Sequence, residues 1–134
     1  MKSYTDIEQS KKLAEILPLE SADMWWNFYS VTTDDTTPQI IHLDTPWVGN
    51  FNWDNKPDNI PCCSLAALLE QLDEEITDEN GNDYNLTIVK ENLQYQLYYH
   101  DSWGQAEDIE TDYYDDMVDA CVEMIVKLHE QKLL

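Results

Sequence analysis

The spacing of apolar residues predicts three amphipathic helices. The first begins at the capping-box sequence of residues 5–8 and ends before Pro18. The second follows Ser64 and carries leucines at positions i, i+3, i+4 and i+7. The last is the clearest, with Asp112 as its expected N-cap and basic residues near its end, where the helix dipole favours cations. Its expected buried face comprises Met117, Ala120, Cys121, Met124, Ile125 and Leu128.

Alternating apolar and polar positions predict strands between these helices. Residues 24–31 and 39–43 are typical of a hairpin, and residues 47–54 repeat with a period of two. A second hairpin is expected after the Asn80–Gly81 turn, with Leu93, Tyr95, Leu97 and Tyr99 on one face and a charged edge strand over residues 105–110. The sequence thus predicts one α+β domain over residues 1–134, in which three helices pack on an antiparallel sheet of about four to five strands. The expected order is α-β-β-α-β-β-(β)-α.

The charge balance excludes several kinds of partner. The chain has 28 acidic residues against seven lysines and no arginine, a net charge of −21. Direct binding of nucleic acid is therefore not expected, because such binding depends on neutralising phosphates with basic side chains. Membrane binding is not expected either, since no apolar stretch approaches ~18 residues and the first residues lack the apolar core of a signal peptide. Three cysteines, two of them adjacent, suit a reducing compartment, so we expect a cytoplasmic protein.

No combination of residues points to catalysis, a metal or a cofactor. Cys62 and Cys63 precede a helix start, and His42 or His100 could approach them in space, but small buried cysteines are the commoner case. The acidic sequence 78–83 lacks the glycine and glutamate spacing of a calcium loop. We therefore predict no catalytic residue, no metal site, no cofactor and no enzymatic activity.

Two groups of residues are candidates for binding a partner protein. Long segments in small domains are often functional, and exposed aromatic residues are enriched at the energetic centres of interfaces. The aromatic candidates are Trp47, Phe51 and Trp53 in a long segment, together with Trp103 in a turn. The acidic candidates recur at three- and four-residue spacing towards the C-terminus: Asp112, Asp115, Asp116, Asp119 and Glu123.

Three segments together show a resemblance. They are KKLAEILPLESADMWW (residues 11–26), IPCCSLAALL (60–69) and VDACVEMIVKLHE (118–130), about 39 residues in all. This combination resembles a group of small uncharacterised proteins encoded by phages and mobile elements of gut bacteria. The resemblance implies a bacterial or phage setting, and it carries no activity and no catalytic residue over to this chain.

These observations support three hypotheses on function. The first is a non-enzymatic accessory protein that binds a host protein, basic in character, through an acidic face and an aromatic loop. The second is a nucleic-acid mimic that occupies the DNA site of a host enzyme; duplex DNA would compete with it. The third is a domain that binds sugars or small ligands through its tryptophans, which a ligand panel would detect by fluorescence. The identity of the partner and the oligomeric state stay open.

Overall fold

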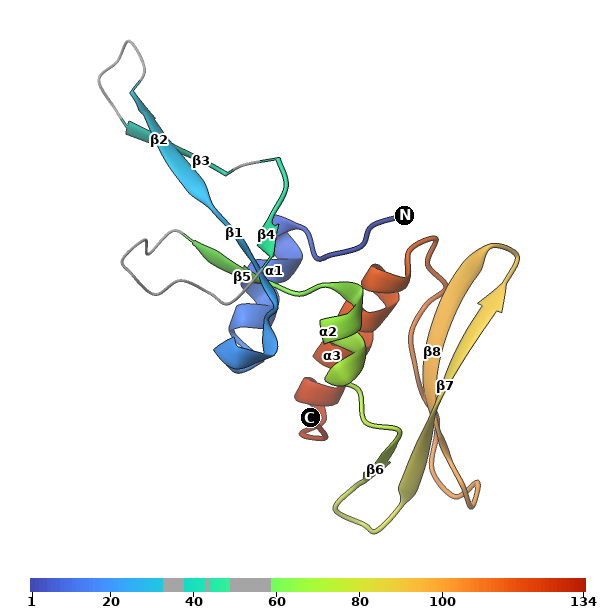
Figure 1. The fold of residues 1–134 in the computed structure, drawn as a ribbon. Coiled ribbons are helices and arrows are strands. Elements are labelled where there is room, and N and C mark those ends of the chain that lie inside the picture. Colours follow the sequence, from blue (N-terminus) through green and yellow to red (C-terminus); the bar gives the residue numbers. More distant parts are fainter. Residues whose placement is uncertain (33–37, 43, 49–58) are drawn as a thin grey trace. The chain divides into compact units, whose positions relative to one another are not determined.

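The computed structural model describes residues 1–134 apart from 33–37, 43 and 49–58. The chain divides into two compact units (Figure 1). One comprises Tyr4–Ser64, and the other joins Met1–Ser3 to Leu65–Leu134. The prediction of a single domain stays a prediction.

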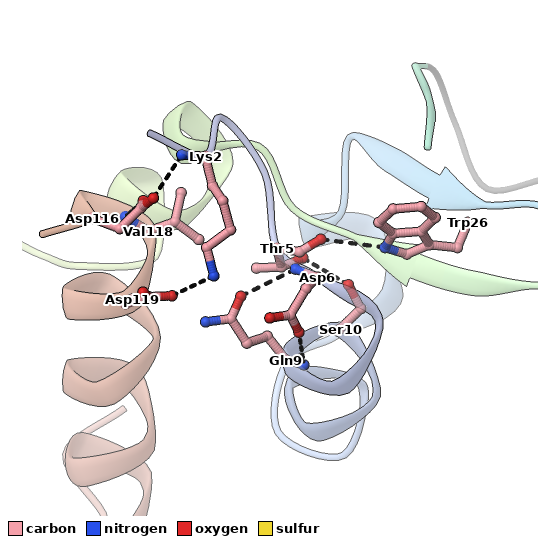
Figure 2. Close-up of polar contacts among 9 residues, drawn as sticks. All are labelled: Lys2, Thr5, Asp6, Gln9, Ser10, Trp26, Asp116, Val118 and Asp119. Carbon is pink, nitrogen blue, oxygen red and sulfur yellow. Dashed lines mark hydrogen bonds and ion pairs between the residues drawn. The ribbon is translucent and has the colours of Figure 1, made fainter. Parts of the chain in front are cut away.

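The unit Tyr4–Ser64 begins with helix α1 (Ile7–Ala14), whose cap lies one residue later than predicted. The Asp6 carboxylate accepts the N–H of Gln9 at 2.8 Å, and the Gln9 side chain accepts the N–H of Asp6 at 3.1 Å, so the capping box is Asp6–Gln9. The expected capping residue, Thr5, is instead completely buried. Its hydroxyl lies 2.7 Å from that of Ser10 (Figure 2). It also accepts the N–H of Cys63 at 3.2 Å, which anchors the start of the helix to the residue that follows β5.

The described residues of this unit also form five strands. They are β1 (Met24–Trp26), β2 (Phe28–Thr32), β3 (Pro38–His42), β4 (Trp47–Val48) and β5 (Ile60–Cys62), with a 3-10 turn, η1 (Leu19–Ser21), before them. In the described residues, β4, β1 and β5 form one antiparallel sheet in that order, and β2 pairs with β3 as a hairpin. The strand predicted over residues 24–31 is therefore two strands, of which only the second belongs to this hairpin. Trp26, Ile60 and Cys62 form the buried centre, against which Tyr4, Ile7 and Met24 pack. The Trp26 indole N–H donates to the carbonyl of Thr5 at 3.3 Å (Figure 2).

The second unit contains a four-stranded antiparallel sheet in the order β6-β7-β8-β9. Its strands are β6 (Glu75–Thr77), β7 (Asp83–Glu91), β8 (Gln94–Asp101) and β9 (Ile109–Glu110). Helix α3 (Met117–Glu130) packs against β8, and helix α2 (Leu65–Glu70) packs against α3 (Figure 1). The core is formed by Leu68, Leu72, Leu97, Tyr99, Ile109, Val118, Cys121, Met124, Ile125 and Leu128.

Helix α3 begins at Met117, so the prediction that Asp112 caps it is wrong. Asp116 is the cap: one carboxylate oxygen accepts the N–H of Val118 at 3.1 Å, and the other accepts the N–H of Lys2 at 2.6 Å. The Lys2 side chain forms an ion pair with Asp119 at 2.6 Å (Figure 2). The first residues of the chain are thereby attached to the start of the last helix.

The start of β8 also differs from the prediction, which placed Leu93 in this strand. Asn92 and Leu93 have φ values of 51° and 64°, and β8 begins only at Gln94. Two successive positive φ values are typical of the tight turns whose twist matches a hairpin. Leu93 therefore lies in the turn with 82% of its surface exposed, while Tyr95, Leu97 and Tyr99 share the face that we expected for all four.

The α+β class is confirmed, and the order of elements broadly follows the prediction. In the described part of the chain the strands form sheets of three, two and four strands, where we expected one sheet. β9 lies at the edge of its sheet beside β8, within the predicted edge segment. No helix among the described residues has the length and apolar character needed to cross a membrane.

Candidate partner-binding site

The most exposed tryptophan of the described residues, Trp103, lies in the loop that follows β8. Its side chain is 76% exposed, although tryptophan is usually largely buried. We refer to residues 101–106 as the Trp103 loop. It turns at Gly104, whose φ of +67° lies in the left-handed region that glycine adopts without strain.

The Trp103 loop is organised by the carboxylate of Asp101. This residue is fully buried, and one of its oxygens accepts the N–H of Trp103 at 3.1 Å. The other oxygen accepts the N–H groups of Gln105 at 2.7 Å and Ala106 at 2.8 Å. The hydrogen bond from Trp103, with those from Ala106 and Gln105, holds the pKa of Asp101 below its usual range against the opposing effect of burial. The carboxylate thus fixes the backbone from which Trp103 projects.

A second aspartate orders the neighbouring turn at the same end of the sheet. The Asp78 carboxylate accepts the backbone N–H groups of Asn80 and Asn82, both at 2.9 Å, and the side-chain amide of Asn82 at 2.9 Å. The hydrogen bonds from Asn82 hold the pKa of Asp78 below its usual range. The Tyr84 hydroxyl donates to Asp78 at 3.2 Å, and burial, followed by this hydrogen bond, raises the pKa of Tyr84.

Two further contacts hold the Trp103 loop in place, one to the start of β7 and one between the residues on either side of the loop. The N–H of Ser102 donates to the carbonyl of Asp83 at 3.0 Å, which connects the loop to the start of β7. His100, the residue before the loop, contacts the carboxylate of Asp108 at 2.6 Å, so residues on both sides of the loop are linked. The exposed indole is therefore carried by a segment that is held from both ends and from its centre.

The other predicted aromatic residues lie elsewhere. Trp47 lies in β4 with 52% of its surface exposed, and its ring packs against that of Trp25 at a centroid distance of 5.5 Å. Phe51 and Trp53 lie outside the described residues. Trp103 belongs to the unit that contains β8, whereas Trp47 belongs to the unit Tyr4–Ser64.

The predicted acidic row is engaged mainly in contacts within the protein. Asp116 and Asp119 hold Lys2, as described above, and Glu123 accepts the N–H of Asp112 at 3.1 Å and pairs with Lys127 at 3.4 Å. Asp115 accepts the side-chain amide of Gln94 at 3.1 Å. Gln94 begins β8 and the Trp103 loop follows its end, so Asp115 and Trp103 lie at opposite ends of a strand that spans about 25 Å. The aromatic and acidic candidates of this unit do not form one continuous row.

The thiols show no sign of activation. Cys62, Cys63 and Cys121 are all free and buried. Burial raises the pKa of each thiol, to about 12 for Cys63 and Cys121. Among the described residues, no three His, Cys, Asp or Glu side chains are grouped so as to hold a metal ion.

The roles of Asp101 and Asp78 were not predicted from the sequence. A signal was present for Asp101, because aspartate followed three residues later by glycine favours a β-turn stabilised by the aspartate side chain, and Asp101 and Gly104 have that spacing.

Comparisons with protein-family models, with curated proteins and with solved structures find no match.

Proposed function

We propose that this chain is a small non-enzymatic accessory protein, of phage or mobile-element origin, that binds a host protein with Trp103 as its anchor. The observation that carries the proposal is a 76% exposed indole on a loop whose backbone is held by the buried Asp101. Tryptophan is enriched among the residues that dominate binding energy at interfaces. A preorganised loop also avoids part of the entropy cost of ordering a binding segment.

The charge of the chain supports a partner with a basic surface. With a net charge of −21, the protein repels acidic surfaces and attracts basic ones over distances longer than a direct contact. Such attraction mainly raises the rate of encounter and selects among partners, whereas a buried aromatic anchor slows dissociation. The two features are complementary parts of one binding mechanism.

A nucleic-acid mimic and a cysteine enzyme gain no comparable support. A nucleic-acid mimic needs rows of carboxylates spaced like phosphates, and several members of the predicted row hold Lys2, Lys127 or backbone N–H groups. An enzyme with a cysteine nucleophile needs a thiolate, and the described thiols are buried with raised pKa values.

The proposal is tested by capture of proteins from a gut-bacterial lysate on three immobilised variants: the wild type, Trp103→Ala and Leu93→Ala. Leu93 is the matched control, because it is as exposed as Trp103 and lies at the other end of β8. We expect a protein that the wild type and Leu93→Ala retain and Trp103→Ala loses. A set of captured proteins that does not change with Trp103→Ala would contradict the proposal. Release of a DNA-binding protein by duplex DNA would favour the mimic instead.

A further inference from the structure

The chemistry of the Trp103 loop indicates which group of a partner it receives. Indole is the best aromatic surface for a cation among the natural side chains. Among the described residues, the cation–aromatic contact of this unit joins Lys90 to Tyr95, with the Lys90 Nζ 5.6 Å from the centroid of the Tyr95 ring. Lys90 and Tyr95 are paired near the Asn92–Leu93 turn, at the end of the hairpin away from Trp103. Trp103 takes no part in this contact, and its side chain is 76% exposed.

Acidic residues surround the loop along the chain and across the sheet. The segments 78–83 and 101–108 together contain six acidic residues and neither lysine nor arginine. They are neighbours in space, because Ser102 donates to the carbonyl of Asp83 and Tyr84 pairs with Asp101 across β7 and β8. Three of the six, Glu79, Glu107 and Asp108, are solvent-exposed, and Asp108 also contacts His100. A cation that approaches Trp103 therefore meets carboxylates and no competing basic side chain from these two segments.

We infer that Trp103 binds the guanidinium group of an arginine side chain on a basic segment of the partner protein, an inference that rests on the proposed function. Guanidinium is planar, so it stacks flat on an indole and keeps its edge N–H groups for neighbouring carboxylates, whereas the ammonium group of lysine is a compact point charge. The chain contains no arginine. A second copy of this protein therefore cannot supply the group, and the occupant comes from a different protein.

The test measures binding of three short peptides of equal length, built on glycine and serine, which carry two arginines, two lysines or two citrullines. Citrulline has the shape of arginine without its charge. The readout is the indole N–H signal of Trp103 in a nitrogen–proton correlation spectrum of the full-length protein, identified by its absence in Trp103→Phe. Leu93→Ala is the control variant, and binding to the variants is followed by anisotropy of labelled peptides.

We expect the arginine peptide to shift the Trp103 signal and to bind more tightly than the lysine peptide. Loss of the indole in Trp103→Ala should weaken its binding about two- to five-fold, the range for an exposed cation–aromatic contact. Leu93→Ala should leave it unchanged, and the citrulline peptide should not shift the signal. An equal response to arginine and citrulline, or no response at Trp103, would overturn the inference. Trp103-dependent capture of a lysate protein would then still support the proposed function, so the two failures are distinguishable.

Discussion

The buried carboxylate of Asp101 accepts the backbone N–H of Trp103, two residues later, at 3.1 Å. One of the least exposed side chains of the unit therefore determines where one of its most exposed side chains lies. Because the same carboxylate also accepts the N–H groups of Gln105 and Ala106, the loop has one acceptor for three backbone donors. The binding proposed for Trp103 would therefore require this acceptor as well as the indole.

Replacing Asp101 by Asn should loosen the Trp103 loop. An amide offers one acceptor oxygen where the carboxylate offers two, so at least one of the three backbone donors loses its partner. We expect faster amide hydrogen exchange at Trp103, Gln105 and Ala106, with the amides of α3 unaffected at temperatures well below unfolding. Unchanged exchange at all three loop amides would show that the carboxylate does not hold the loop.

Stability should depend on pH through the same carboxylate. Its pKa is lower in the folded protein than the value of about 3.9 in an unfolded chain, so the unfolded state binds more protons below that pH. The stability that Asp101 contributes is therefore fully present above about pH 4 and is lost as pH falls through the lower folded value. Across this pH range, the free energy of unfolding measured in urea should fall more steeply for the wild type than for Asp101→Asn. Parallel curves would contradict the assignment.

Asp116, the cap of α3, should contribute more to the free energy of unfolding than its acidic neighbour Asp115. Asp116→Ala removes an acceptor from Val118 and from Lys2, so we expect a loss of about 1–2 kcal/mol in the free energy of unfolding. Asp115→Ala removes the same charge one residue earlier but only an exposed contact to Gln94, so its effect should stay within about 0.5 kcal/mol. Equal losses in chemical denaturation would mean that charge, not capping, is what matters here.

The three thiols should be inert in the folded protein. Cys62, Cys63 and Cys121 are buried and their pKa values are raised, so little thiolate exists near neutral pH. A chromogenic disulfide reagent near pH 8 should react slowly with the native protein and quickly with all three thiols in denaturant. One thiol that reacts rapidly before unfolding would reopen the question of a cysteine enzyme.

Periodicity predicted those parts of the fold in which burial repeats regularly. The apolar stripe of α3 and the alternation of Tyr95, Leu97 and Tyr99 are examples, because each reflects one face against a core. Ends of elements were less predictable. Thr5 fits a helix cap by sequence, but contacts with Ser10 and Cys63 hold it in the core, and the cap moves to Asp6.

The candidate site was predictable only in part. Trp103 was a candidate because it is an aromatic residue in an expected turn. The carboxylate that holds this turn, Asp101, could not be identified in the same way, because its role depends on how the backbone folds around it. The acidic row followed helical spacing, whereas the contact of Asp116 with Lys2 joins residues 114 positions apart. Local pattern carries no information on such a contact.

Calorimetry with a captured partner would measure how much Trp103 contributes to its binding. Three variants are compared: the wild type, Trp103→Ala and Leu93→Ala. We predict that Trp103→Ala raises the dissociation constant at least about 30-fold, because an anchor residue contributes about 2 kcal/mol or more to binding. Leu93→Ala should change the dissociation constant less than about two-fold. Equal affinities of the wild type and Trp103→Ala for that partner would show that Trp103 is not its anchor.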